Sequence, residues 1–208
     1  MSKILTIDYE TSDSRVNFGQ VLQAGIVIAD DKLNIQSRHE LRCRLKPTVI
    51  PSIGACLVHK IPVNILKNSN KSHYEMVLEH YKLIKDNTPS IVMGFNQVAF
   101  DIEFYRRMLF KSLIPDVYQT NTNGNRHLDI LNVTRAAKFA DNESIKTILN
   151  EKNRDSFKLS DLSTANEINN GTSHDAITDC LNSIDLAKII FKKTNNIWNE
   201  ALLLSTKK

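Results

Sequence analysis

The chain has 208 residues, of which 41% are hydrophobic and 24% are charged, with a formal net charge of +4. This profile is typical of a soluble globular protein and leaves room for one domain with a sizeable core. The mild positive charge permits nucleic-acid binding without requiring it.

The same composition argues against membrane and secreted classes. No run of 18 apolar residues occurs, so no membrane-spanning helix is expected. The N-terminus lacks the basic and apolar segments of a secretion signal. The three cysteines, Cys43, Cys56 and Cys180, are far apart and match neither a metal-ligand spacing nor a disulfide framework. We therefore expect a protein of the reducing cytoplasm.

The first part of the chain predicts strands. Apolar and alternating patterns favour strands at 3–9, 21–29 and 35–45, with a turn at Asp30 and Asp31. Short connections between consecutive strands predict an antiparallel meander. Prolines at 47, 51 and 62 then predict a loop over 47–62.

The rest of the chain predicts helices around one further strand. A buried strand is expected at 90–95, and helices at 73–85, 99–109, 128–139, 159–165 and 175–192. This order predicts an α/β or α+β fold with a central mixed sheet. We expect one domain over 1–194, followed by a short helix or tail over 195–208.

Two carboxylates stand at the end of the first predicted strand. Asp8 and Glu10 are two residues apart, so their side chains project from the same face. Adjacent buried carboxylates repel, and a hard divalent cation such as Mg²⁺ removes that cost. For the pair taken alone, a polar strand end facing solvent is the simpler interpretation.

Further candidates lie in two later segments. Asp101 follows a buried strand near a helix start, where a helix-dipole role is the simpler alternative. His174 and Asp179 are about 140° apart around a helix, so they converge only if His174 precedes the helix and Asp179 lies within it. The alternative for His174 is a surface or capping residue.

Together these segments resemble the DEDDh 3′–5′ exonucleases of the ribonuclease H-like superfamily, and most closely the catalytic domain of bacterial exonuclease I. The resemblance covers about residues 4–192 and rests on five ordered motifs: DYET, GFNQVAFD, RHLDILNVTRA, SFKLSDLSTAN and HDAITD. It implies a ribonuclease H-like fold, α/β, with a central mixed five-stranded sheet flanked by helices.

The resemblance also implies a reaction. It is hydrolysis of single-stranded DNA from the 3′ end to 5′-nucleotides, with two Mg²⁺ ions as cofactors and Mn²⁺ as a substitute. Asp8 would bridge the metals, Glu10 and Asp179 would complete one site, and Asp101 would help hold the second. His174 would be the general base.

The resemblance implies substrate contacts by Glu10, Thr11, Phe100, Arg106, Arg135, Lys158 and His59. For each basic side chain, the alternative to a substrate contact is a solvated surface position. For Phe100, the alternative is a position in the core. Lys158 replaces an arginine of exonuclease I, so its contact would be a point charge. His59 stands where exonuclease I has threonine.

Other departures leave alternatives open. Exonuclease I is more than twice this length, and the loop SDSRVNFGQ differs from its counterpart there. An RNA or short-oligonucleotide substrate is therefore an alternative, since compact relatives act on RNA, often as dimers. A homodimer or an accessory protein is a possible partner arrangement. A non-catalytic nucleic-acid-binding module is a weaker alternative, and a zinc hydrolase weaker still, because no histidine or cysteine cluster accompanies the acids.

Overall fold

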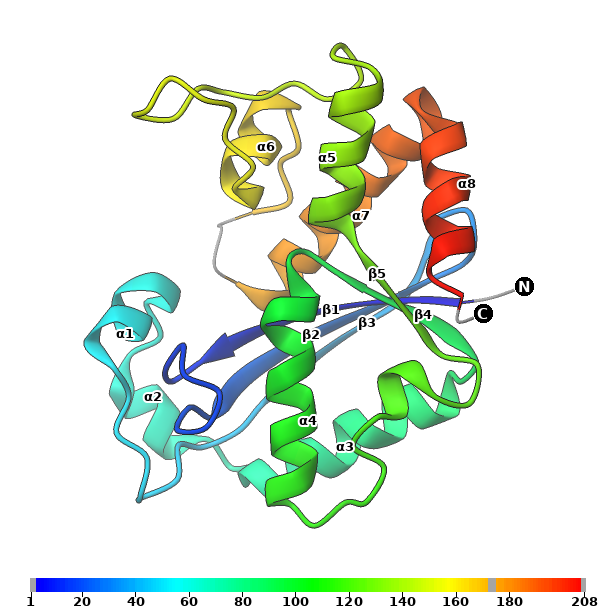
Figure 1. The fold of residues 1–208 in the computed structure, drawn as a ribbon. Helices are drawn as coiled ribbons and strands as arrows, with labels where there is room; N and C mark the ends of the chain where they lie inside the picture. Colours follow the sequence, from blue (N-terminus) through cyan, green and yellow to red (C-terminus); the bar gives the residue numbers. More distant parts are fainter. Residues whose placement is uncertain (1–2, 172–174, 207–208) are drawn as a thin grey trace.

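A five-stranded mixed sheet forms the centre of the computed structural model, which describes residues 3–171 and 175–206 (Figure 1). The strand order is β3-β2-β1-β4-β5. The strands are β1 Lys3–Thr11, β2 Val21–Ala29, β3 Ile35–Arg42, β4 Ser90–Gly94 and β5 Arg126–Asp129. β1, β2 and β3 pair antiparallel, whereas β4 and β5 run parallel to β1. The expected meander and the five-stranded mixed sheet are confirmed.

Helices cover both faces of this sheet (Figure 1). They are α1 Ile53–His59, α2 Val63–Asn68, α3 His73–Asp86, α4 Asp101–Lys111, α5 Ile130–Ala140, α6 Leu159–Ala165, α7 Ala176–Lys193 and α8 Asn195–Leu204. Helices α3 and α4 pack on one face, and α5, α7 and α8 pack on the other.

Side-chain alternation along the strands divides the interior into two cores. Ile4 of β1 packs with the α5, α7 and α8 side, while Leu5 and Ile7 pack with the α3 and α4 side. Every residue of β2 is buried, so both of its faces are covered. β3 alternates exposed and less exposed residues, as expected at the edge of a sheet.

Two expectations were wrong in part. The segment 47–62 is not wholly a loop, because Ile53–His59 form α1. The Ser52 side chain caps this helix by accepting a hydrogen bond from the Ala55 backbone N–H at 3.1 Å. The helix expected at 128–139 starts at Ile130, because the preceding Arg126–Asp129 pair with β4 as the fifth strand.

The C-terminal helix α8 packs against the core. Trp198 of α8 is 1% exposed and packs in the same core as α5 and α7. Within the described ranges, no helix is both long and apolar enough to cross a membrane.

Candidate active site

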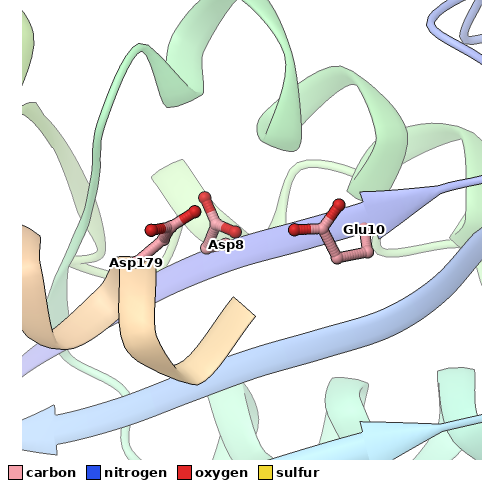
Figure 2. Close-up of side chains that lie close together, drawn as sticks. All are labelled: Asp8, Glu10 and Asp179. Carbon is pink, nitrogen blue, oxygen red and sulfur yellow. The ribbon is translucent and has the colours of Figure 1, made fainter. Parts of the chain in front are cut away.

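Three carboxylates meet where the C-terminal end of β1 faces the first turn of α7. Asp8 and Glu10 project from β1 and Asp179 from α7, and ligand oxygens of the three lie within 4.8 Å of one another. Figure 2 shows the carboxylates turned towards a common space. Residues about 170 positions apart in the sequence thus form one cluster of negative charge.

The close approach of α7 to the sheet brings Asp179 to this place. Gly25 of β2 pairs with Asp8 across the ladder, and a Cβ at Gly25 would lie 2.4 Å from the carbonyl oxygen of Ala176. The Cys180 thiol lies 3.4 Å from the carbonyl oxygen of Gly25. Only glycine, which has no Cβ, lets the backbone of Ala176 come this close to β2. Sequence reasoning missed Gly25, and its only signal was a glycine inside a strand.

The start of α7 is also held by a polar contact to β2. The Asp175 carboxylate caps the helix by accepting from the Thr178 backbone N–H at 3.2 Å. The Gln23 side chain donates to Asp175 at 2.8 Å and to Glu40 at 3.1 Å. Gln23 is 1% exposed, so its amide is committed to these contacts. It therefore positions α7, and with it Asp179.

A fourth carboxylate lies at the N-terminus of α4. Asp101 is 3% exposed, and its Oδ1 is buried with no hydrogen-bond partner among the described residues. Burial raises the pKa of Asp101 to about 8, with a smaller contribution from Asp129. A buried polar atom without a protein partner is uncommon in a native structure, and a water molecule or a metal ion would satisfy it.

The turn before α4 is fixed by motif residues that do not enter the cluster. The Asp129 carboxylate accepts from the Asn96 backbone N–H at 2.9 Å and from the Val98 backbone N–H at 3.3 Å. The Gln97 side chain donates to the carbonyl oxygens of Val92 and Leu128 at 2.8 and 3.1 Å. These bonds tie the strand β4, the strand β5 and the start of α4 together, so they aim Asp101.

The electrostatics of the cluster favour a cation. Burial and then the nearby carboxylates, Asp101 first, raise the pKa of Asp8 well above its usual range. Burial, followed by Asp179, raises the pKa of Glu10 to about 8. Like charges with little solvent are costly to hold together, and hard divalent cations prefer carboxylate oxygens. Asp8, Glu10 and Asp179 therefore fit a divalent metal site, and Asp101 lines the same cleft.

The carboxylates line a cleft of about 470 Å³. One wall comes from α1, through Gly54, Ala55 and Val58. Three further residues implied by the exonuclease resemblance, Thr11, Phe100 and His59, also line this cleft. The helix α1, which was absent from the expected fold, thus closes one side of the site.

His59 is the last residue of α1 and lines the cleft. Its Nδ1 accepts a hydrogen bond from the Ile61 backbone N–H at 2.9 Å. Its Nε2 is buried and has no hydrogen-bond partner among the described residues. Burial lowers the pKa of His59 below its usual value, which favours the neutral ring.

The other two wall residues are fixed by short contacts. The Thr11 hydroxyl donates to the carbonyl oxygen of Asp13 at 3.0 Å. Phe100 precedes Asp101, and its ring centroid lies 4.8 Å from that of Phe104. One face of the cleft therefore carries an aromatic ring beside the buried carboxylate of Asp101.

The three basic residues implied by the resemblance do not line this cleft. Arg106 pairs with Glu103 at 2.6 Å and lies 5.0 Å above the ring of Tyr118. Arg135 lies 5.7 Å above the ring of Phe157, which packs with α5 and α7. Lys158 lines a separate surface cavity near Asn150.

His174, the expected general base, lies outside the described residues. Asp175, the first described residue after the gap, is the cap of α7 and stands four residues before Asp179.

Comparison with known proteins identifies relatives of this architecture. No protein-family model matches the sequence. The chain is 28% identical over 205 residues to exodeoxyribonuclease I of Buchnera aphidicola subsp. Baizongia pistaciae, which covers 98% of this chain and 42% of the relative. It therefore spans less than half the length of the curated relatives it matches.

Solved structures of E. coli exonuclease I share the fold. The complex with a dT13 oligonucleotide matches with a TM-score of 0.91 and 23% identity, over 98% of this chain and 46% of that chain. The zinc-bound complex with single-stranded DNA matches with a TM-score of 0.89 and 24% identity, over 96% and 42%. The matches confirm the resemblance over nearly the whole chain and its ribonuclease H-like exonuclease fold.

Proposed function

We propose, from the homology of this chain to bacterial exonuclease I over nearly its whole length, that it is a metal-dependent 3′–5′ exonuclease that hydrolyses single-stranded DNA to 5′-nucleotides. The observation that carries the proposal is the meeting of Asp8, Glu10 and Asp179 within 4.8 Å, beside the buried Asp101. The homology supports the class of reaction, and the carboxylate cluster is the site at which the reaction would occur.

The four carboxylates would hold the two Mg²⁺ ions, with Mn²⁺ as an alternative. The raised pKa values of Asp8, Glu10 and Asp101 and the unpartnered Oδ1 of Asp101 support this assignment. When bound, two divalent ions supply charge stabilisation to the attacking and leaving oxygens of phosphodiester hydrolysis. Asp8 would help to hold both ions. Glu10 and Asp179 would complete the site of one ion, and Asp101 would help to hold the other.

The remaining cleft residues would orient the 3′ end. Glu10 and Thr11, at the end of β1, would contact the terminal sugar. Phe100 would stack with a base, since aromatic rings bind single strands without sequence preference. The neutral ring of His59, with its Nε2 unpartnered, would donate to or accept from the terminal nucleotide.

His174 would act as the general base, because an imidazole of near-neutral pKa suits proton removal from the attacking water. Its position in the sequence, just before the cap of α7, supports this role. It would receive that proton while the carboxylates remain ionised.

Arg106, Arg135 and Lys158 would contact strand phosphates beyond the cleft. Such contacts position a strand without reading its sequence. The relatives crystallised with oligonucleotides support single-stranded DNA as the substrate. RNA is the second candidate, because the loop between β1 and β2, which adjoins the cleft through Ser14, departs from the exonuclease I pattern.

The test uses single-stranded DNA and RNA labelled at either end, incubated with Mg²⁺ or with EDTA. We expect shortening from the 3′ end with Mg²⁺, release of 5′-nucleotides, and no reaction in EDTA. Asp8→Asn should abolish cleavage, whereas Asp31→Asn, at an exposed turn, should retain it.

Two results would overturn the proposal. Cleavage that persists in EDTA would exclude a metal-dependent reaction. Equal inactivity of the wild type and Asp8→Asn, combined with oligonucleotide binding, would favour the non-catalytic module. Faster cleavage of RNA than of DNA would instead make RNA the substrate, and the proposed metal-dependent hydrolysis would be unaffected.

A further inference from the structure

A second cavity, of about 270 Å³, lies on the α4 side of the sheet, away from the carboxylate cluster. The loop between β1 and β2 forms one wall and α4 forms another, and Figure 1 shows this loop beside α4. The Lys111 ammonium joins the two walls by donating to the carbonyl oxygen of Asn17 at 2.9 Å. None of the described residues that line this cavity is acidic.

Three cations face this cavity: Lys46, Arg107 and Lys111. Within residues 3–171 and 175–206, none of them forms an ion pair with a carboxylate. Burial, and then repulsion by Lys46 and Arg107, lower the pKa of Lys111. The positive charge of this cavity is therefore concentrated and lacks a protein counter-charge.

A buried histidine also borders this cavity. His73 lines the cavity and is 4% exposed, and its Nδ1 is buried with no hydrogen-bond partner among the described residues. Burial, together with Lys46 and Lys111, lowers the pKa of His73 to about 4. A neutral imidazole carries one N–H donor, on Nδ1 or on Nε2, so His73 can donate one hydrogen bond.

We propose that this cavity binds a phosphate group, held by Lys46, Arg107 and Lys111 with His73 as a further donor. Arginine matches phosphate geometry with two N–H groups, and lysine contributes a point charge. The binding needs no metal and no residue of the carboxylate cluster. It is therefore an additional site, separate from the proposed hydrolysis.

The phosphate comes either from the backbone of a nucleic-acid strand or from a small phosphate ion. The course of α4 favours the strand, an argument that rests on the proposed function. The helix begins at Asp101 in the cleft and ends at Lys111 in this cavity, about 15 Å further on at 1.5 Å per residue. A nucleic-acid strand with its 3′ end in the cleft would then also be bound in this cavity, through a phosphate on the 5′ side of that end.

The first experiment decides whether the site exists. The ¹⁵N-labelled full chain is titrated with inorganic phosphate in EDTA at constant ionic strength, and the amide signals of 17–20 are followed. We expect saturable shifts in the wild type and their loss in Arg107→Gln/Lys111→Gln. Lys82→Gln/Lys192→Gln, which removes the same charge from exposed positions on α3 and α7, should bind like the wild type. Absent shifts, or equal shifts in both double variants, would overturn the site.

The second experiment identifies the source of the phosphate. A single-stranded oligonucleotide is titrated in EDTA into Asp8→Asn protein with and without Arg107→Gln/Lys111→Gln. Strand binding predicts shifts at the same amides, and a salt dependence of log affinity that is shallower by about 0.7 for one lost phosphate contact. Shifts with inorganic phosphate alone would assign the site to a small phosphate. Because nothing is hydrolysed in EDTA, failure of the proposed exonuclease activity would leave both results readable.

Discussion

Gly25 lies directly across the β1–β2 ladder from Asp8, and the backbone of the first turn of α7 rests on it. A residue without ligand atoms therefore sets the separation between the two elements that carry Asp8 and Asp179. The carboxylate cluster depends on this backbone contact as much as on the carboxylates.

Gly25→Ala should weaken both the fold and the site. The added Cβ would lie 2.4 Å from the carbonyl oxygen of Ala176, so α7 must move away from the sheet. We expect a loss of about 1–3 kcal/mol in the free energy of unfolding, in the range of overpacked cores, and a weaker affinity for Mg²⁺. Urea denaturation and Mg²⁺ titration measure the two effects. Gly54→Ala, where a Cβ meets no atom within 4 Å, should cost no stability.

The metal-free protein should lose stability as the pH rises from about 4.5 to about 8. The ordinary pKa of Glu10 is 4.5, and burial beside Asp179 raises it to about 8 in the folded chain. Over this range the unfolded chain has released the proton that the folded chain still holds, so folding becomes less favourable. The slope approaches about 1.4 kcal/mol per pH unit for each such group. Urea denaturation in EDTA at several pH values measures it.

Two controls assign this slope to the cluster. Glu10→Gln removes one titrating group and should flatten the dependence on pH. Saturating Mg²⁺ should also flatten it, because a cation stabilises the ionised carboxylates. Equal slopes in the wild type and Glu10→Gln would contradict the raised pKa of Glu10.

Gln23→Glu should disturb α7 without touching the proposed metal ligands. The new carboxylate would face Asp175 and Glu40 at positions where the amide now donates hydrogen bonds of 2.8 and 3.1 Å. We expect a loss of about 1–3 kcal/mol in the free energy of unfolding, because a buried donor is replaced by a like charge. Thermal denaturation tests this, and Gln36→Glu, at an exposed position on β3, should have little effect.

Asp129→Ala should lower stability and also affect the site at a distance. Asp129 accepts from the Leu131 backbone N–H at the start of α5 and from the Asn96 and Val98 backbone N–H groups before α4. Loss of a cap costs about 1 kcal/mol, and the loosened turn would misplace Asp101. We expect reduced hydrolysis at low Mg²⁺ that is partly rescued in Asp129→Asn, which keeps one oxygen acceptor. Equal rates in Asp129→Ala and the wild type would show that this turn does not position Asp101.

The spacing rules predicted the parts of the fold and site that follow from local geometry. Alternation along a strand placed Asp8 and Glu10 on one face, and the apolar pattern of 175–192 predicted α7 almost to its ends. The motifs added Asp101, which no spacing rule links to β1. Convergence of Asp179 with β1 required the resemblance as well, because contacts between distant segments leave no local pattern.

The elements that escaped prediction lack strong local signals. β5 has four residues, of which only Leu128 is buried, so neither alternation nor length marks it as a strand. Helix α1 lies between prolines that favour a loop, and the Ser52 side chain that caps it is recognised in the structure. The roles of Gly25 and Asp175 arise from tertiary contacts with α7, and they become visible only when the helix is packed on the sheet.

The carboxylates come from three elements, β1, α4 and α7, and this has a consequence for the order in which the site forms during folding. Asp8 and Glu10 share one face of β1, which pairs with β2 through contacts close in the sequence, whereas α7 must return across about 170 residues of chain before Asp179 joins them. Long-range contacts of this kind form late when loop closure limits the rate. A divalent cation would then bind only after α7 has docked, so it would slow unfolding more than it would speed folding.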